Sequence, residues 1–417
     1  MKRIFLLLFF VCFNYANAQG LKFSSSDELQ NISKPQENQF GFAEEIPSRY
    51  SMEEFVPMVL EQQGGTCVGF SSTYYALSTM YNVKFKINSF KGKVAHSFDP
   101  YFIYTIMQNN VDNCDDGLVF YEAMELLKNA GAKKMFYPPF LTCNSTWTRD
   151  EISNTLPYTK PYSLKEFYNL DLEKDNIVEF AKEMIYYDIP VVGGFNITKS
   201  LYPYSSNNLS GVKASGLWTP SEIEGSEGGH AMCIIGYDNY KYGGAFRVVN
   251  SWGSEYGDNG YIWMRYSDFE KYAVEAYVFE LNENLDLPNE DKFELKDDDY
   301  SRIKLGASVG TYEGQEYLER LTGYGIFSSK KDDTYYMGKF TNAEMEGYFL
   351  FLDDDGLFSS KVIGGKFYEI NQLGFANNDE SNKNDSNLKK YLESINSKVE
   401  LRKATSTKTN KISTKIN

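Results

Sequence analysis

The sequence has 417 residues, which exceeds the usual size of one domain, so we expect at least two folded units. Hydrophobic residues make up 42% and aromatic residues 16% of the chain, and this composition argues against global disorder. The formal net charge is −15, and such a surface repels phosphate backbones. We therefore expect no nucleic-acid partner.

Residues 1–18 are predicted to be a secretory signal peptide. A basic pair at residues 2–3 precedes an apolar run over residues 4–13 and the small-residue cleavage pattern Ala16-Asn17-Ala18. The apolar run is roughly half the ~20 residues that a membrane-spanning helix needs. We therefore expect a secreted or periplasmic protein with no transmembrane segment in the mature chain, and loss of the basic pair changes the net charge from −15 to −17.

Composition divides the remaining chain into five segments. They are a flexible leader (19–46), a mixed α and β domain (47–281), an acidic linker (282–300), a repeat region (301–376) and a polar tail that we expect to be disordered (377–417).

Within the mixed domain, helical signals come first and strand signals follow. Asp99-Pro100 predicts the start of a helix, and residues 121–129 have the spacing of a helix that ends at Gly131. Strands are predicted at residues 190–192, 231–237, 246–249 and 261–265. The predicted fold class is therefore α+β.

Glycines recur in pairs nine residues apart in the repeat region. The pairs are Gly314 and Gly323, Gly338 and Gly347, and Gly365 and Gly374, with aromatic residues beside them. This pattern predicts stacked β-hairpins and resembles degenerate MORN repeats over about residues 310–376. An ordinary small antiparallel sheet is the alternative, and the repeats suggest a protein or surface partner.

The chain contains only two histidines, His96 and His230, which restricts the possible catalytic sites. Metal sites built from several histidines are excluded, no His/Cys cluster has zinc spacing, and no G-x-S-x-G motif of a serine hydrolase is present. We expect no cofactor and no metal. His96 precedes the predicted helix start at Asp99 and is interpreted as a surface or capping-region residue without a chemical role.

Cys67 is the candidate nucleophile. It follows a loop with two glycines and begins a helix-like apolar pattern, so its thiol is predicted to lie at a helix N-terminus. There the helix dipole favours a thiolate and should lower the pKa of the thiol. The alternative interpretation is a buried core cysteine.

His230 and Asn250 are candidates for its partners. One predicted strand opens with His230, and the next strand ends in Asn250, so antiparallel pairing can place the two side chains together. An Asn amide that accepts from one ring nitrogen leaves the other nitrogen facing the thiol. Trp252 could shield that hydrogen bond from water, although a lone aromatic residue is more often part of the core.

Six short motifs, in this order, resemble landmarks of the papain-like cysteine peptidase family. They are residues 47–50, 59–62, 65–70 and 229–231, followed by the pair 250–253 and 257–261. The resemblance implies a papain-like two-lobed fold, with Cys67 on a helical lobe and with His230 and Asn250 on a β-barrel-like lobe. An extended peptide would bind in the cleft between the lobes.

The resemblance also assigns further residues. Gln62 matches the family's oxyanion donor but lies five positions before Cys67 instead of six, which leaves Gln63 as a rival. Cys114 and Cys143 fall where family members often have disulfide cysteines, whereas Cys233 on an apolar strand is predicted to be a core residue.

The predicted function is that of a secreted cysteine endopeptidase that acts on proteins or peptides through an acyl-thioester intermediate. Two alternatives remain open at this point. One is a catalytically inactive binding protein with the papain fold, and the other is an enzyme that transfers the acyl group to an amine, as transpeptidases and transglutaminases do.

Overall fold

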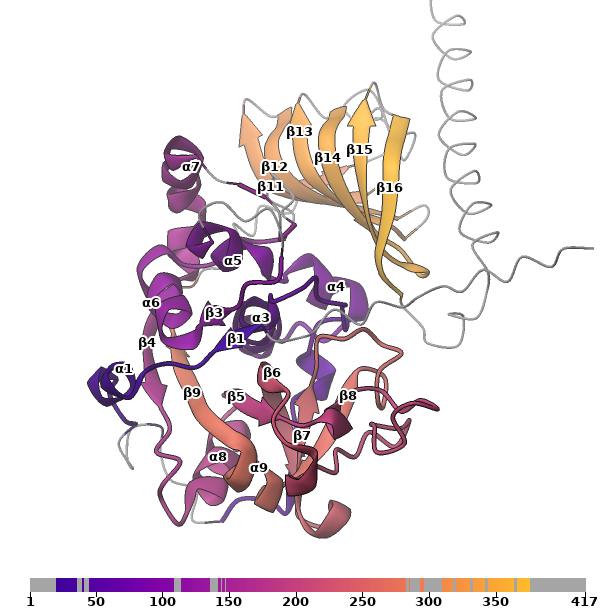
Figure 1. The fold of residues 1–417 in the computed structure, drawn as a ribbon. Helices are drawn as coiled ribbons and strands as arrows, with labels where there is room; N and C mark the ends of the chain where they lie inside the picture. The colour runs from indigo at the N-terminus through magenta and orange to yellow at the C-terminus, as the bar shows by residue number, and fades with distance from the viewer. Residues whose placement is uncertain are drawn as a thin grey trace, which may run out of the picture.

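The structure is a computed structural model and describes most of the chain between residues 20 and 375. The described residues are 20–35, 40, 45–108, 114–135, 142–143, 145–146, 148–282, 285, 293–295, 310–317, 320–330, 333–341, 344–363 and 366–375. The predicted signal peptide and the predicted tail lie outside them. Figure 1 shows the three parts of the molecule: a helical lobe, a lobe built on an antiparallel sheet, and a separate C-terminal sheet.

The helical lobe is built around one long helix that begins at Cys67. Its three consecutive stretches are α2 (Cys67–Gly69), the π-helical η2 (Phe70–Leu77) and α3 (Ser78–Lys84). The other α-helices are α1 (Ser26–Asn31), α4 (Phe90–Ala95), α5 (Tyr101–Met107), α6 (Phe120–Ala130), α7 (Arg149–Thr159), α8 (Ile177–Tyr186) and α9 (Tyr266–Tyr272). Short 3₁₀ turns are η1 (Glu53–Phe55), η3 (Lys160–Tyr162), η4 (Lys199–Leu201), η5 (Glu222–Glu224) and η6 (Lys241–Gly243).

The local helix signals in the sequence are confirmed. The Asp99 carboxylate accepts a hydrogen bond from the Tyr101 N–H at 2.9 Å, which caps the start of α5. Helix α6 ends at Gly131, whose φ of 78° favours glycine. The lack of a side chain at Gly69 lets α5 approach the long helix, because an added Cβ would lie 2.1 Å from the Pro100 carbonyl oxygen.

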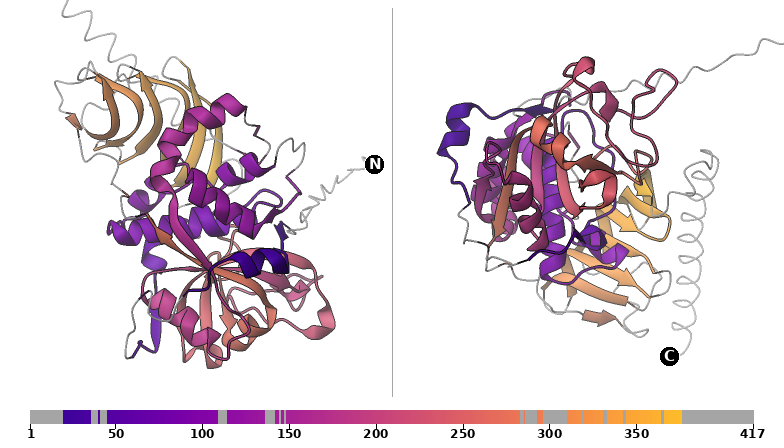
Figure 2. Two further views of the ribbon diagram at one scale, coloured as in Figure 1. Left: turned by 90° about the vertical axis from the view of Figure 1, so that its left-hand side faces the viewer. Right: turned by 90° about the horizontal axis from the view of Figure 1, so that it is seen from below.

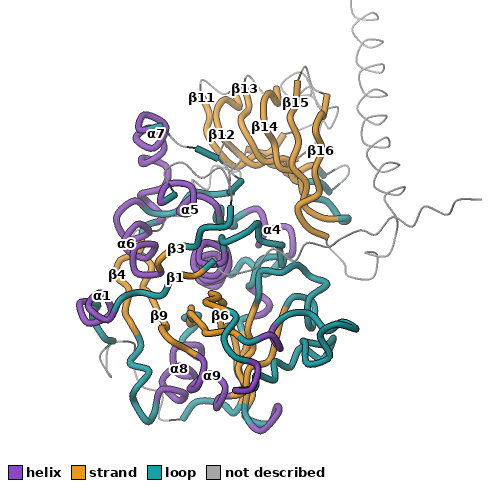
Figure 3. The backbone as a smooth tube through the Cα atoms, in the orientation of Figure 1, coloured by secondary structure: helices purple, strands orange, loops and turns teal. Residues whose placement is uncertain are grey.

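The second lobe is an antiparallel sheet in the order β4-β9-β5-β6-β7-β8, with β2 paired to β6. The strands are β2 (Arg49–Ser51), β4 (Leu164–Asn169), β5 (Val191–Ile197), β6 (Gly228–Asp238), β7 (Ala245–Val249), β8 (Tyr261–Arg265) and β9 (Ala273–Leu281). The four predicted strands overlap β5, β6, β7 and β8, although residues 190–192 cover only the start of β5. Most helices precede the strands of this sheet along the chain, and Figure 3 shows both kinds of element, which confirms the α+β class.

Part of the predicted flexible leader instead has a defined place in the fold. Strand β1 (Leu21–Lys22) pairs in parallel with β3 (Leu118–Val119), and α1 follows it. Ser25 and Glu28 form a reciprocal capping box at the start of α1. The segment therefore crosses between the two lobes instead of extending away from them.

The C-terminal sheet is an antiparallel meander of seven strands. The strands are β10 (Phe293–Leu295), β11 (Gly310–Tyr317), β12 (Arg320–Ser329), β13 (Tyr335–Thr341), β14 (Glu344–Leu352), β15 (Gly356–Ile363) and β16 (Lys366–Phe375). Strand β10 lies within the predicted linker, where the sequence suggested no strand. The small C-terminal β domain predicted from the sequence is confirmed.

Aromatic rings pack over glycines of neighbouring strands in this sheet. A Cβ on Gly325 would lie 2.4 Å from the Tyr312 ring, and one on Gly338 would lie 2.8 Å from the Phe349 ring. At these two positions the lack of a side chain has a packing cause, because the ring occupies the space that a side chain would need, whereas nothing lies within 4 Å of a Cβ on Gly347. One face of the sheet holds its own aromatic core, which includes Phe340 and Phe358.

Candidate active site

Cys67 is the first residue of α2, and its side chain is completely buried. Burial raises the pKa of the Cys67 thiol to about 12. Hydrogen bonds from nearby backbone N–H groups lower this pKa but do not offset burial; the groups belong to Ala231, Val68, Cys67 itself and Gly20. The lowered pKa predicted from the helix start is therefore wrong for this buried state. The thiol keeps its proton at neutral pH.

His230 is the third residue of strand β6, and Asn250 follows strand β7 directly. Nε2 of His230 lies 2.8 Å from Oδ1 of Asn250. The same Oδ1 accepts a hydrogen bond from the Ser251 N–H at 2.8 Å, which identifies this atom as the oxygen of the amide. Nε2 must therefore be the donor, and Nδ1 of the neutral ring carries the free lone pair.

The helix that begins at Cys67 packs directly on the strand that carries His230. Helix α2 contacts β6, and the Cys67 sulfur lies beside the backbone N–H of Ala231, the residue after His230. Nδ1 of His230 is buried and has no hydrogen-bond partner among the described residues. Burial lowers the pKa of His230 to about 4, although the bond to Asn250 acts in the other direction. Thiol and imidazole are thus both neutral in this state.

Trp252 covers the imidazole, as the sequence suggested. Its ring centroid lies 4.7 Å from that of His230, and the Tyr202 ring stacks on it at 5.5 Å with an interplanar angle of 3°. The indole is half-buried. These contacts shield the His230–Asn250 hydrogen bond from solvent.

The two candidate oxyanion residues lie in different surroundings. The backbone N–H of Gln62 donates to the Ser251 carbonyl oxygen at 2.7 Å, and the Gln62 side-chain oxygen accepts from the Ser251 hydroxyl at 2.5 Å. Gln62 is thereby tied to the residue next to Asn250. Gln63 is directed elsewhere, because its Oε1 lies 3.2 Å from the sulfur of Cys143.

Cys114 and Cys143 are joined by a disulfide, as the family resemblance implied. The carbonyl oxygen of Cys114 accepts a hydrogen bond from the Gly65 N–H at 2.5 Å, two residues before Cys67. The disulfide therefore supports the loop that leads into the helix beginning at Cys67. Cys233 is buried and unpaired in strand β6, which agrees with the predicted core role.

The N-terminal segment covers Cys67 and His230. A Cβ on Gly20 would lie 2.4 Å from the backbone of Gly65, and a Cβ on Gly229 would lie 2.6 Å from the carbonyl oxygen of Leu21. The Gly20 carbonyl oxygen also accepts from the Leu118 N–H at 3.0 Å. Residues 20–21 therefore fill the space above Cys67 and beside His230, which explains why both side chains are buried.

Ser24 anchors this covering segment to the β lobe. Its N–H donates to the Glu275 carboxylate at 3.4 Å, and its hydroxyl lies 3.1 Å from that of Tyr277. Tyr277 in turn donates to the other Glu275 oxygen at 2.7 Å. Sequence reasoning missed this cover, although the spacing of Ser25 and Glu28 was a signal for an ordered helix start.

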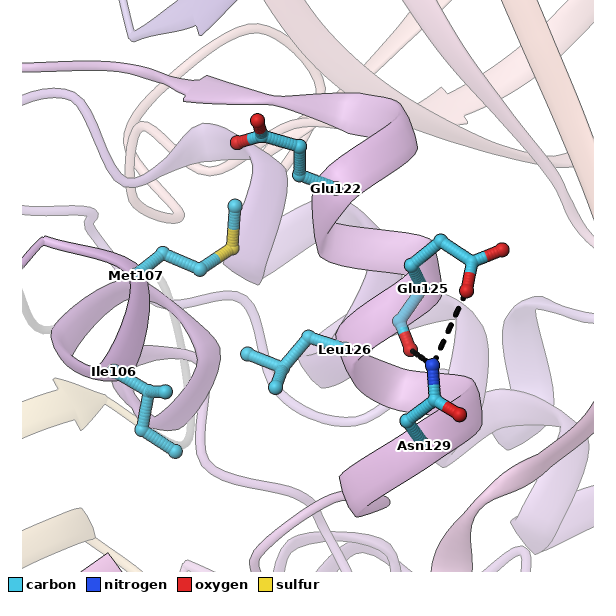
Figure 4. Close-up of a pocket in the computed structure, with 6 residues that line it drawn as sticks. All are labelled: Ile106, Met107, Glu122, Glu125, Leu126 and Asn129. Carbon is cyan, nitrogen blue, oxygen red and sulfur yellow. Dashed lines mark hydrogen bonds between the residues drawn. The ribbon is translucent and has the colours of Figure 1, made fainter. Parts of the chain in front are cut away.

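The remaining candidates lie away from the site. His96 is the C-cap residue of helix α4, is half-buried and stacks on Tyr81, so of the two predicted positions it has the one in the capping region. Figure 4 shows a cavity of about 400 Å³ beside helices α5 and α6, where the Asn129 amide donates to the Glu125 carboxylate at 3.1 Å. It holds no catalytic pair. Within the described ranges, no cluster of metal-ligating side chains and no helix able to span a membrane is found.

Comparison with known proteins identifies the family. The profile of the papain family cysteine proteases matches residues 48–280. An uncharacterized peptidase C1-like protein of Acanthamoeba polyphaga mimivirus is 34% identical over 100 residues, which make up 24% of this chain and only 30% of that protein.

Solved structures show the same kind of similarity. Xylellain, a cysteine protease from Xylella fastidiosa, is 19% identical with a TM-score of 0.49, over 64% of this chain and 96% of that one. Procathepsin L2 from the larval midgut of Tenebrio molitor is 21% identical with a TM-score of 0.48, over 64% and 79%. Because the family profile spans more than half of the sequence, the chain belongs to the papain family of cysteine proteases.

Proposed function

We propose that this papain-like peptidase is a secreted endopeptidase that hydrolyses peptide bonds with Cys67, His230 and Asn250. One observation carries the proposal: the Cys67 sulfur lies beside the residue that follows His230, and the lone pair on Nδ1 of that histidine has no other partner among the described residues. The substrate class, a protein or peptide, follows from the family. The signal-peptide pattern and the Cys114–Cys143 disulfide support export to an oxidising compartment.

In the proposed reaction, Nδ1 of His230 takes the proton from Sγ of Cys67, and the thiolate attacks the carbonyl carbon of the scissile bond. The C–N bond breaks as Nδ1 gives the proton to the leaving amine, and a thioester remains. Water then attacks the thioester and loses a proton to Nδ1. That proton returns to the sulfur when the carboxylic acid leaves.

Gln62 is the proposed oxyanion donor. Its Nε2 donates to the Gly64 carbonyl oxygen at 2.5 Å, and an amide nitrogen has a second proton that it can donate. The position beside Ser251 supports Gln62 over Gln63, since it places the amide next to the segment that carries Asn250. We also keep the proposal that the C-terminal sheet, with its MORN-like sequence pattern, contacts a protein partner.

Labelling and product analysis test the function. A site-specific protease sequence inserted within residues 36–39 allows residues 20–35 to be released, and the cut protein is then treated with an epoxide thiol inhibitor. We expect one label on Cys67 and none on Cys233, together with cleavage of a peptide library that Cys67→Ala abolishes. Absence of both would favour the inactive binding protein. Amide products formed with an added amine, in place of free acids, would favour acyl transfer.

A further inference from the structure

The C-terminal sheet does not stand apart from the peptidase. Figure 2 shows it against the helical lobe, away from the β lobe. Ile326, Met337 and Leu350 are buried in the same apolar cluster as the residues of the helical lobe. Lys91 of helix α4 forms ion pairs with Asp333 and, at 3.2 Å, with Asp354. Apolar contact and ion pairs together hold the sheet in one position.

A cavity of about 380 Å³ lies between this sheet and the peptidase domain. We call it the interdomain pocket. Its peptidase wall includes residues 60–63 and Tyr101, and its sheet wall consists of Leu350, Ser359, Gln372 and Leu373. Two separate parts of the chain are therefore needed to form it.

The interdomain pocket is continuous with the proposed catalytic residues. Gln62 lines the pocket and also binds Ser251, the neighbour of Asn250. Glu61 lines the pocket and pairs with Trp252, whose ring covers His230. One wall of the pocket is thus the same segment that borders the catalytic pair.

The lining fits an extended polypeptide that carries a bulky apolar side chain. Leu373 supplies the accessible apolar surface, since 38% of it remains exposed, whereas Leu350 at the floor is buried. The amides of Gln63 and Gln372 can donate to and accept from a peptide backbone. None of the residues that line the pocket is basic, and Glu61 is exposed, so an acidic segment would be repelled.

The sheet extends the same kind of surface beyond the pocket. Tyr348, Lys361 and Tyr368 lie opposite one another on adjacent strands. The exposed fraction is 45% for Tyr348 and 46% for Tyr368. Exposed tyrosines are frequent anchors of bound peptides because they combine apolar area with a polar group.

We propose that the interdomain pocket is a docking site for the polypeptide substrate, on the side of the catalytic pair bordered by residues 60–63. The proposal rests on the proposed peptidase function. The C-terminal sheet supplies the second wall, and selectivity for long, unfolded chains over short peptides depends on it. An apolar side chain of the substrate enters between Leu373 and the peptidase wall.

Leu373→Asp tests the docking site, with Leu209→Asp as the matched control, because Leu209 is 68% exposed and does not line the pocket. Binding is measured first, by fluorescence anisotropy of labelled casein with the full chain carrying Cys67→Ala. We expect Leu373→Asp to weaken casein binding about tenfold, as loss of one buried leucine contact implies, and Leu209→Asp to leave it unchanged. Equal binding by the two variants would overturn the proposal.

Hydrolysis provides the second measurement and separates the two proposals. The protein used here has Cys67 intact and residues 20–35 released. Leu373→Asp should lower the ratio of kcat/KM for casein to kcat/KM for a fluorogenic tetrapeptide about tenfold, mainly by raising KM for casein. An unchanged ratio would refute the docking site while the peptidase function stands. If the protein with the native pocket cleaves neither substrate, the proposed function fails, and the binding measurement still decides the docking site.

Discussion

Oδ1 of Asn250 lies 2.8 Å from Nε2 of His230 and at the same distance from the backbone nitrogen of Ser251. The Ser251 N–H can only donate, so it fixes which end of the amide faces the imidazole. The imidazole is then held with its proton on Nε2 and its lone pair on Nδ1. A backbone donor that sequence inspection did not reveal thus sets the tautomer on which the proposed chemistry depends.

Asn250→Ala should lower kcat about tenfold, because one hydrogen bond of ~1.5 kcal/mol no longer orients the imidazole. The bond to Asn250 raises the pKa of His230. Its loss should therefore move the histidine limb of the pH–rate profile to lower pH. Steady-state kinetics over a pH series would measure both effects. A variant with a lower melting temperature but an unshifted profile would indicate a purely structural role.

Gly20→Ala should make Cys67 more reactive in the full-length protein. The added Cβ would lie 2.4 Å from the Gly65 backbone, so the covering segment cannot keep its position. Water then reaches the thiol, and its pKa should fall from the value of about 12 that burial imposes. We expect alkylation by iodoacetamide at pH 7 to accelerate at least about tenfold, the change that one pKa unit gives.

Gln30→Ala is the matched control for that experiment, because Gln30 lies on the exposed surface of α1. Its alkylation rate should equal that of the unmodified chain. Complete release of residues 20–35 should exceed the effect of Gly20→Ala. If all three proteins react at the rate of the unmodified chain, the segment does not control access to Cys67.

Folding stability should fall in acid partly because of His230. Burial lowers its folded pKa to about 4, whereas an exposed histidine titrates near pH 6.5. Between these values the unfolded chain binds the extra proton, so the free energy of unfolding decreases as the pH falls from about 6.5 to about 4. The shift corresponds to about 3 kcal/mol. Urea titrations at pH 7 and pH 4 should show a smaller loss for His230→Gln, and an equal loss would contradict the assignment.

Local patterns predicted the two lobes of the peptidase domain well. The start of the helix at Cys67 and the strands around His230 and Asn250 depend on short-range signals that one sequence displays. The position of Leu21 was not predictable in the same way. Two residues of strand β1 carry no periodicity, and their pairing with Leu118 is a contact across almost a hundred residues.

The packing of the C-terminal sheet on the helical lobe could not be predicted from the sequence, for a related reason. The glycine and aromatic pattern indicates hairpins, and at Gly325 and Gly338 a ring from the neighbouring strand fills the space over the glycine. Alternation along β14 places Phe349 in the aromatic core of the sheet and Leu350 in the core of the helical lobe. The side chains along β14 show that both faces of the sheet are apolar. They do not show which part of the molecule covers the second face, because that depends on the tertiary fold.

Replacement of both Cys114 and Cys143 by serine should lower the free energy of unfolding by about 3 kcal/mol. The bond closes a loop with a sequence separation of 29, and closure restricts the unfolded chain by about this amount. Urea denaturation of the variant and of the reduced unmodified protein should give the same loss. A difference between the two would show that serine at these positions perturbs the native state independently of the bond.

Removal of the C-terminal sheet should destabilise the peptidase domain, because Leu350 and Met337 are buried in its core. A chain ending at residue 299 should melt more than about 5 °C lower, the shift that ~2 kcal/mol produces in a domain of this size, and should bind more of the dye ANS. A chain ending at residue 376 is the matched control and should melt like the full chain. Turnover of a tetrapeptide per folded molecule should stay within about twofold after release of residues 20–35, since the sheet adds no catalytic group. Equal melting of the two shortened chains would show that the sheet contributes nothing to the stability of the lobe on which it packs.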